Sequence, residues 1–313
     1  MIPTSALGRV VFGCGNFGGL GSSPSLRDKG DGRERALALL DQARDLGLTR
    51  YDTANTYGGG ASEAVLGAWL RAQDGAFREA VEVATKVGNP NGCPPGERPL
   101  SRMQVALHLD ESLRRLGLER IPLYYLHEFD PLTPLDETLE ALDRALAAGK
   151  IAAFGVSNAT VADLKAVLAL ATGALRRAFT HVQNGFNLLE TDDLAEVIPL
   201  AASEGLSYVA FSPLAGGLLT GKYDYGRPAD AGTRVADAPG FFSDRLTSAT
   251  FDAIAGLEQR AAEQGWTIPG AALRFILDTP GVDSLIVAPR SAAQFADYGL
   301  APLHREFDRA PRV

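Results

Sequence analysis

The segment Arg33–Asp52, RERALALLDQARDLGLTRYD, joins one helical pattern, one glycine and one short strand pattern. Apolar residues with helical spacing lie on one face of its first part: Leu39, Ala43 and Leu46. Gly47 follows where a helix commonly ends, and Thr49–Asp52 is a short strand candidate that ends in a carboxylate. The segment therefore predicts a helix that returns directly to a strand, which is half of a βα repeat.

The same order of helix, glycine and strand recurs along the chain, at Leu116-Gly117, Ala148-Gly149 and Glu204-Gly205. The strand candidates are Val10–Phe12, Thr49–Asp52, Val81–Lys86, Ile121–Leu126, Ala152–Val156, His181–Phe186, Leu206–Phe211 and Ser284–Val287. The helix candidates are Arg33–Leu46, Ser62–Leu70, Arg102–Leu116, Leu135–Ala148, Val161–Leu175, Asp192–Glu204, Thr250–Gln264 and Pro269–Leu277, with a short helix opening near Ser291. This alternation favours an α/β protein of the (β/α)8 TIM barrel type, with a doubly wound parallel sheet as the competing architecture.

Composition limits the function classes. No Ser/Pro-rich linker divides the 313 residues, so we expect one domain over residues 1–313, with a long loop from Ser212 to about Leu246. A net charge of −8 argues against a nucleic-acid partner. Because the sequence has neither a signal-peptide pattern nor an apolar run of membrane-spanning length, we expect a cytoplasmic protein without a membrane partner. Cys14 and Cys93 are expected to be free thiols.

A glycine-rich stretch, Gly13-Cys14-Gly15-Asn16-Phe17-Gly18, matches the dinucleotide-binding pattern G-x-G-x-x-G and follows a strand candidate. In a Rossmann site the last glycine belongs to the first turn of a helix. Here Gly18 is followed by Gly19–Pro24, which resists helix formation, and no strand-ending acid about 20 residues further on completes the pattern. We therefore interpret the stretch as a loop after the first barrel strand.

Ionisable residues stand at the ends of three consecutive strand candidates: Asp52 with Tyr57 five residues later, Lys86, and His127. Active sites of parallel barrels gather at these strand ends. A lysine ammonium is expected to lower the pKa of a nearby tyrosine, a carboxylate to keep the lysine charged, and a neutral histidine to donate a hydrogen bond to a carbonyl oxygen. This set predicts acid–base chemistry at a carbonyl or alcohol without a protein nucleophile, which suggests a hydride from a nicotinamide. The histidines show no H-x-H pair, so no metal is expected.

The chain resembles the aldo-keto reductase superfamily over nearly its whole length. The matching segments are Tyr51-Asp52-Thr53-Ala54-Asn55-Thr56-Tyr57-Gly58, Ala84-Thr85-Lys86, Tyr124-Tyr125-Leu126-His127, Gly149-Lys150, Gly155-Val156-Ser157-Asn158, Gln183, and Phe211-Ser212-Pro213-Leu214-Ala215-Gly216-Gly217-Leu218. The resemblance implies a (β/α)8 barrel and a catalytic tetrad of Asp52, Tyr57, Lys86 and His127. Tyr57 would be the general acid in reduction and the general base in oxidation.

The resemblance also implies how a nicotinamide cofactor is bound. Ser157, Asn158 and Gln183 would contact the carboxamide, while Phe211 would stack on the ring. Ser212, Leu214 and Gly216 belong to the loop that would surround the pyrophosphate. Near the adenosine end lie Arg290 and Gln294, in a segment where family members commonly have glycine or lysine at the position of Ala288 and asparagine at that of Tyr298. Because Arg290 is a planar cation suited to a 2′-phosphate, we expect NADPH/NADP+, with NADH as the alternative.

We expect Asn16, Phe17, Glu128 and Phe129 to line the substrate pocket. Glu128 either accepts hydrogen bonds from substrate hydroxyls or points to solvent. The sequence thus predicts an NADPH-dependent oxidoreductase that interconverts an aldehyde or ketone and an alcohol, the substrate being a sugar, nucleotide-sugar or polyketide-type ketone. The alternatives are a nicotinamide-binding, redox-sensing regulatory subunit with little turnover and an NAD-dependent aldose dehydrogenase.

Overall fold

The protein was analysed as a computed structural model, which describes residues 8–300. Eight parallel strands close into a barrel in sequence order, β1 pairing with both β2 and β8. The strands are β1 (Val10–Gly13), β2 (Arg50–Asp52), β3 (Glu82–Val87), β4 (Ile121–Leu126), β5 (Ile151–Ser157), β6 (Phe179–Gly185), β7 (Ser207–Phe211) and β8 (Ser284–Val287). The predicted (β/α)8 barrel is confirmed, and the doubly wound alternative is wrong.

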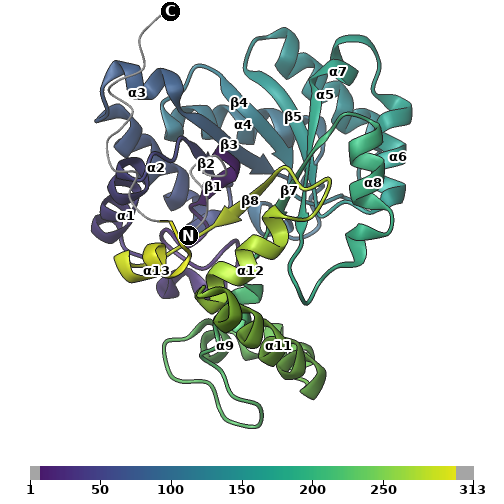
Figure 1. Cartoon of the computed structure of the whole chain (residues 1–313). Helices are drawn as coiled ribbons and strands as arrows, with labels where there is room; N and C mark the ends of the chain where they lie inside the picture. Colours follow the sequence, from purple (N-terminus) through teal and green to yellow (C-terminus); the bar gives the residue numbers. More distant parts are fainter. Residues whose placement is uncertain (1–7, 301–313) are drawn as a thin grey trace, which may run out of the picture.

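Helices surround the barrel (Figure 1). They are α1 (Arg33–Asp45), α2 (Ala61–Arg71), α3 (Gly75–Ala80), α4 (Arg102–Leu116), α5 (Leu135–Ala147), α6 (Val161–Leu170), α7 (Gly173–Ala178), α8 (Val197–Ser203), α9 (Arg234–Asp237), α10 (Pro239–Phe242), α11 (Ser248–Gln264), α12 (Ile268–Leu277) and α13 (Ala292–Asp297). The glycines predicted to end helices, Gly47, Gly117, Gly149 and Gly205, all have the left-handed backbone conformation.

Two predicted helices are interrupted. The pattern over 161–175 gives α6 and α7, because Ala171 and Thr172 are extended and Gly173 has φ +55°. The pattern over 192–204 gives the short 3-10 helix η5 (Asp192–Leu194) and α8. Both interruptions shorten helices, and the strands that follow them, β6 and β7, still form within two residues of the predicted bounds.

The main hydrophobic core lies between the strands and the helices. Side chains alternate along each strand, so that Phe12, Tyr51 and Tyr124 point into this core, whereas Val11, Val209 and Ile286 form a separate cluster inside the barrel. The interior is incompletely filled. A cavity of about 150 Å³ extends from Arg50 and Glu82 to Asp52, lined in part by the small side chains of Ala84 and Ala153.

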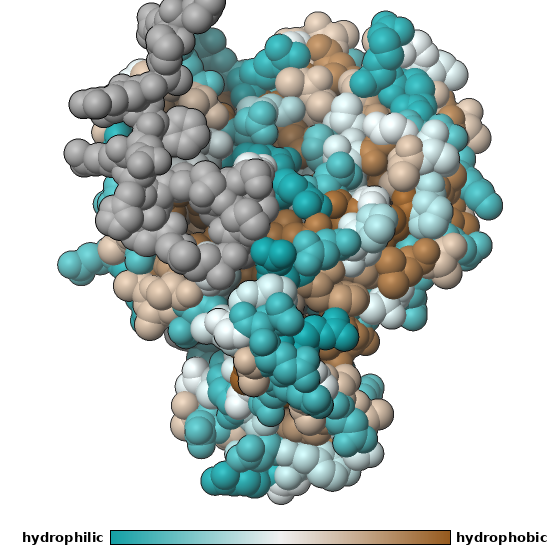
Figure 2. All heavy atoms as spheres, in the orientation of Figure 1, coloured by the Kyte–Doolittle hydropathy of each residue, from teal (hydrophilic) through white to brown (hydrophobic). Residues whose placement is uncertain are grey.

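The G-x-G-x-x-G stretch forms a loop, as predicted. Strand β1 ends at Gly13, and Phe17 makes an isolated bridge with Asp31 shortly before α1. The long loop after β7 carries the short helices α9 and α10. Together with α11, this part of the chain projects from the barrel body at the lower edge of Figure 1, and Figure 2 shows that its visible face is largely hydrophilic. Within residues 8–300, no helix has the length and apolar character needed to cross a bilayer.

Candidate active site

The four residues predicted to carry the chemistry come together at the carboxyl ends of neighbouring strands. Asp52 is the last residue of β2, Lys86 lies in β3 and His127 directly follows β4. Tyr57 opens η3 (Tyr57–Gly60), the 3-10 turn between β2 and α2. Because the carboxyl ends of parallel strands meet at one end of a barrel, these positions bring the four side chains together.

The Lys86 ammonium is the centre of this cluster. Its side chain is 1% exposed, and its Nζ donates to a carboxylate oxygen of Asp52, to the backbone oxygen of Thr53 at 2.8 Å and to the Tyr57 hydroxyl at 3.2 Å. Burial acts to lower the pKa of Lys86, but the attraction of Asp52, joined by Tyr57, outweighs it and raises the pKa. The charged form of Lys86 is therefore favoured, and each of its three N–H groups has an acceptor.

The pKa of Tyr57 differs from the sequence-based expectation. We expected Lys86 to lower it, but burial raises it above its ordinary value near 10, and Lys86 only opposes that effect. The reason is that the sequence shows the neighbouring charge but not the loss of water around the phenol. A tyrosine that stays protonated in this way can donate a proton at neutral pH.

His127 is neutral, as expected. Burial lowers its pKa well below 6.5, and repulsion by Lys86 adds to the effect. The imidazole meets the Tyr57 ring edge-on, with ring centres 5.6 Å apart. Within residues 8–300 the buried Nδ1 has no hydrogen-bond partner. Because a buried N–H without an acceptor is unfavourable, we assign the proton of the neutral ring to Nε2, which can then donate to a substrate oxygen.

The turn that carries Tyr57 depends on glycine. Gly58, Gly59 and Gly60 all have positive φ angles, a conformation that other residues rarely adopt. A side chain on Gly58 would also lie 2.5 Å from the backbone oxygen of Phe17. The loop after β1 and the tyrosine turn are thus packed backbone against backbone.

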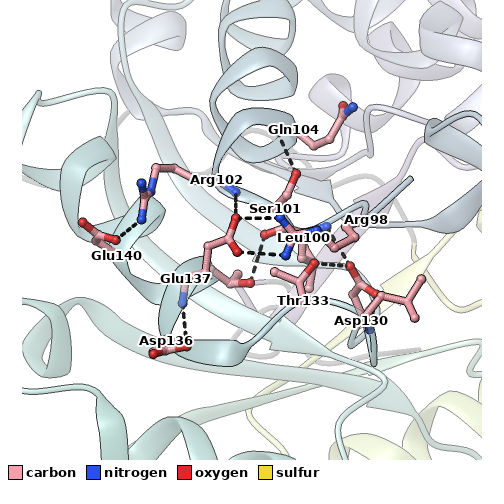
Figure 3. Close-up of polar contacts among 12 residues, drawn as sticks. Arg98, Leu100, Ser101, Arg102, Gln104, Asp130, Thr133, Asp136, Glu137 and Glu140 are labelled. Atoms are coloured by element: carbon pink, nitrogen blue, oxygen red, sulfur yellow. Dashed lines mark hydrogen bonds and ion pairs between the residues drawn. The ribbon is translucent and has the colours of Figure 1, made fainter. Parts of the chain in front are cut away.

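A polar network anchors the loops that follow β3 and β4 (Figure 3). The Asp130 carboxylate accepts from the backbone of Leu100 and from the Thr133 hydroxyl, and Glu137 on α5 pairs with Arg98 at 3.0 Å. Glu137 also accepts from the backbone of Arg102 at 3.1 Å. These contacts tie the chain after Lys86 to the chain after His127.

The residues predicted to contact a nicotinamide lie beside the tetrad. Gln183 on β6 donates its Nε2 to Asp52 at 2.9 Å, and Asn158 donates to the backbone oxygen of His127 at 2.9 Å and to Ser157 Oγ at 3.3 Å. Asn158 has φ +54°, a left-handed conformation that is uncommon for residues other than glycine but that asparagine adopts more readily than most. The contact of Ser157, Asn158 and Gln183 with a nicotinamide stays a prediction.

The loop after β7 is strongly curved. Ser212 and Ala215 have φ angles of +52° and +47°, and the two glycines that follow, Gly216 and Gly217, are also left-handed. Leu214 is buried. Phe211 is half-buried and packs against the interior cluster of the barrel. This curvature suits a backbone that wraps around an anion.

Near the predicted adenosine end, Arg290 precedes α13 and Gln294 lies within it. Gln294 accepts from the backbone N–H of Arg290 at 2.6 Å, so its amide oxygen closes this loop. The Arg290 guanidinium is paired with the buried carboxylate of Asp31. The sequence did not show this pair, because Asp31 precedes α1 at the other end of the chain.

Two of the predicted substrate residues, Asn16 and Phe17, are buried and contact other parts of the fold. Asn16 is buried and donates to the backbone oxygen of Ala288 at 3.4 Å. Phe17, at 1% exposure, belongs to the hydrophobic core and has its ring centre 6.0 Å from that of Phe12. The ring therefore packs in the core in this conformation, and its contact with a substrate stays a prediction.

The other two predicted substrate residues follow β4. Glu128 is half-buried, accepts a hydrogen bond from Asn89 Nδ2 at 2.6 Å, and has a pKa raised by burial and partly restored by Asn89. Phe129 packs partly against the core. The hydrogen bond from Asn89 fixes one carboxylate oxygen of Glu128, and whether the other meets a substrate hydroxyl or solvent stays a prediction.

Two cations that the sequence did not single out lie at the same end of the barrel. Lys222 places its Nζ 3.1 Å from the position that a side chain on Gly217 would occupy. Arg234 on α9 is close enough to Tyr57 and Arg290 to be affected by them, and burial lowers its pKa. The curved backbone after β7, flanked by Lys222, Arg234 and Arg290, fits the chemistry of an anionic dinucleotide. Within the described residues, no three His, Cys, Asp or Glu side chains converge as metal ligands.

The structure is an eight-stranded parallel barrel with a Lys–Asp–Tyr–His cluster at its strand ends, an arrangement suited to acid–base chemistry at a carbonyl group. The family model "Aldo/keto reductase family" matches residues 9–301, and the chain belongs to this family. Its members generally use nicotinamide cofactors and act on small-molecule carbonyl substrates.

Named relatives support an oxidoreductase. The chain is 37% identical over 273 residues to a protein named uncharacterized oxidoreductase YrpG of Bacillus subtilis, covering 84% of this chain and 80% of that protein. It is 32% identical to L-glyceraldehyde 3-phosphate reductase of Escherichia coli over 84% of this chain and 78% of that protein. A probable voltage-gated potassium channel subunit beta of Oryza sativa is 29% identical, over 84% of this chain and 80% of the rice protein.

Proposed function

We propose that this protein is an NADPH-dependent oxidoreductase that reversibly reduces an aldehyde or ketone to an alcohol in the cytoplasm. The observation that carries the proposal is the position of the Tyr57 hydroxyl, 3.2 Å from the Lys86 ammonium and beside a neutral His127. The three groups provide a proton, a fixed positive charge and a hydrogen-bond donor at one place. The protein must supply these three contributions for a carbonyl group to be reduced by a hydride.

Each residue has a distinct role. Nε2 of His127 donates a hydrogen bond to the carbonyl oxygen and orients it toward Tyr57. Tyr57 gives its proton to that oxygen as negative charge develops, and Lys86 stabilises the resulting phenolate. Asp52 keeps Lys86 charged and in place. The nicotinamide, when bound, supplies the hydride. In the direction of alcohol oxidation, the Tyr57 phenolate takes the proton back.

We infer NADPH from the cations near the adenosine end and the loop after β7. Arg290 offers a planar guanidinium to the 2′-phosphate. Lys222 and Arg234 would face the pyrophosphate, with Ser212, Leu214 and Gly216 supplying backbone around it. Ser157, Asn158 and Gln183 would hold the carboxamide, and Phe211 would cover the ring. Gln294 would act indirectly, through the loop that presents Arg290.

For the substrate, we propose a hydroxylated aldehyde or ketone, with sugars, nucleotide-sugars and polyketide-type ketones as the classes to screen. Glu128 follows His127 and has one carboxylate oxygen bound to Asn89, which leaves the other to accept from a hydroxyl. The relative named L-glyceraldehyde 3-phosphate reductase supports beginning with small hydroxyaldehydes.

A second candidate is a redox-sensing regulatory subunit with little turnover. It is favoured by the relatives that are named channel beta subunits. Both candidates bind a nicotinamide cofactor, so turnover distinguishes them. An NAD-dependent aldose dehydrogenase would use the same tetrad and would differ in preferring NAD+ as oxidant.

The test is steady-state turnover with a panel of aldehydes and ketones at saturating NADPH and NADH, combined with Tyr57→Phe. We expect Tyr57→Phe to keep cofactor affinity and to lose about 10²–10⁴-fold in kcat. The control is Tyr225→Phe, which removes the hydroxyl of an exposed tyrosine on the loop after β7. Unchanged turnover in Tyr57→Phe would exclude the proposed mechanism. Tight cofactor binding without turnover on the whole panel would support the regulatory subunit.

A further inference from the structure

Two arginines from different parts of the chain meet at one buried carboxylate, that of Asp31. Arg290 donates Nε to both carboxylate oxygens at 3.1 Å and Nη2 to Oδ1 at 3.0 Å. Arg35 on α1 places its Nε 3.2 Å from the same Oδ1. The Asp31 side chain is 1% exposed, whereas that of Arg290 is 32% exposed. A buried carboxylate thus holds a partly exposed guanidinium.

Asp31 itself is fixed by the backbone around it. Its N–H donates to the backbone oxygen of Asn16 at 2.6 Å, and its own backbone oxygen accepts from Gly18 at 2.9 Å. The preceding Gly30 packs so tightly that a side chain on it would lie 2.1 Å from the backbone nitrogen of Gly19. The carboxylate is therefore held by the folded loop after β1 and cannot follow a moving arginine.

The geometry of the pair leaves part of Arg290 available. A guanidinium can make bidentate contacts along two edges, one with Nε and Nη2 and one with both Nη atoms. Asp31 occupies the first edge, which leaves the second. The backbone on both sides is also held, since Gln294 accepts from the Arg290 N–H and Arg35 Nη2 donates to the Arg290 carbonyl oxygen. With two guanidinium groups on one carboxylate, the cluster keeps an excess positive charge.

We propose that Asp31 is a positioning residue that determines cofactor preference, by holding Arg290 with its terminal edge toward a phosphate monoester, the 2′-phosphate of NADPH. This inference rests on the proposed function. Without Asp31, Arg290 would have to lose its rotamer freedom when the phosphate binds, at a cost in affinity. NADH has no 2′-phosphate, so its affinity does not depend on this arrangement.

The test is isothermal titration calorimetry of the full chain with NADP+ and NAD+, for the natural protein, Asp31→Asn and Arg290→Gln. We expect a preference for NADP+ in the natural protein and a loss of about tenfold or more in NADP+ affinity in both variants, with a much smaller change for NAD+. The fragments 2′,5′-ADP and 5′-AMP should show the same difference. Asp31→Glu, which keeps the charge, should restore part of the preference.

The affinity ratio is the informative measurement, because general damage to the loop would weaken both nucleotides together. The matched control is Glu204→Gln, which removes the carboxylate of another arginine pair, Arg176–Glu204 at 3.0 Å, at the opposite end of β7. Equal or tighter NADP+ binding by Asp31→Asn would overturn the inference, and so would an equal loss for both nucleotides. If the natural protein bound neither nucleotide, the proposed function itself would fail.

Discussion

The Lys86 ammonium lies 3.2 Å from the Tyr57 hydroxyl and 4.8 Å from the centre of its ring. A cation in this position stabilises the phenolate, yet burial keeps the pKa of Tyr57 above its ordinary value. Tyr57 therefore stays protonated at neutral pH, and Lys86 reduces the free-energy cost of forming its phenolate when the proton is transferred. The Asp52 carboxylate is needed because Lys86 is itself buried.

The pH dependence of the two directions should differ. Because the pKa of Tyr57 is raised and that of His127 is well below 6.5, both residues are in the state required for reduction across pH 6.5–9. We expect kcat/KM for reduction to be flat over this range, and kcat/KM for oxidation to rise with pH because it needs the phenolate. Initial rates in buffers of constant ionic strength provide the measurement. A group titrating near pH 7 in the reduction profile would contradict this assignment.

Asp52→Asn should destabilise the protein and also slow its catalytic turnover. The variant leaves the Lys86 ammonium buried with no countercharge, which costs about 3–5 kcal/mol in comparable buried pairs. Urea unfolding followed by far-UV circular dichroism measures the loss. Glu82→Gln is the control, since it removes an exposed partner of Arg50 and is expected to change the free energy of unfolding by about 0.5 kcal/mol or less. Similar losses in the two variants would show that Asp52 does not serve as the buried countercharge.

The barrel and the tetrad could be predicted because both follow from local patterns and from one topological rule. Apolar runs alternate with helical periods, and residues at or near the carboxyl ends of parallel strands, such as Asp52 and Lys86, gather at one end of the barrel. The direction of the Tyr57 pKa could not be predicted in this way. It depends on how much water the folded loops remove, which no short stretch of sequence records.

Contacts between segments far apart in the chain also could not be predicted from the sequence. Asp31 and Arg290 are separated by almost the whole chain, and Arg234 lies in a long loop without a periodic pattern. Phe17 illustrates the same point, since a loop aromatic can face either a pocket or the core, and only the folded structure shows this ring packed against Phe12. The loops that follow β1 and β7 lack a periodic pattern, so the contacts of their side chains cannot be predicted from the sequence.

Gly155 on β5 should not tolerate a side chain. A Cβ there would lie 2.5 Å from a ring carbon of Tyr125 and 2.8 Å from the backbone oxygen of His181. Because one of these neighbours is backbone, we expect Gly155→Ala to lower the free energy of unfolding by about 1–3 kcal/mol. Gly256→Ala, in the open middle of α11, should instead raise it by about 0.5–1 kcal/mol. Thermal unfolding of both variants checks the prediction, and a neutral Gly155→Ala would contradict the packing inside the barrel.

His181 should make the protein sensitive to acid below pH 6.5. Burial, reinforced by Arg50 and opposed by Asp283, lowers its pKa to about 4 in the folded protein, compared with about 6.5 in the unfolded chain. Above pH 6.5 both states are neutral at this residue and it has no effect. As the pH falls from 6.5 to about 4, the unfolded state binds the proton first, so the free energy of unfolding decreases by up to roughly 3 kcal/mol. Urea unfolding at intervals between pH 4 and pH 7 measures this slope.

We expect His181→Gln to reduce the dependence of the free energy of unfolding on pH, leaving the contribution of His127. The control is His108→Gln on α4, which removes a histidine outside the strand barrel. An unchanged slope in His181→Gln would mean that other groups cause the acid sensitivity.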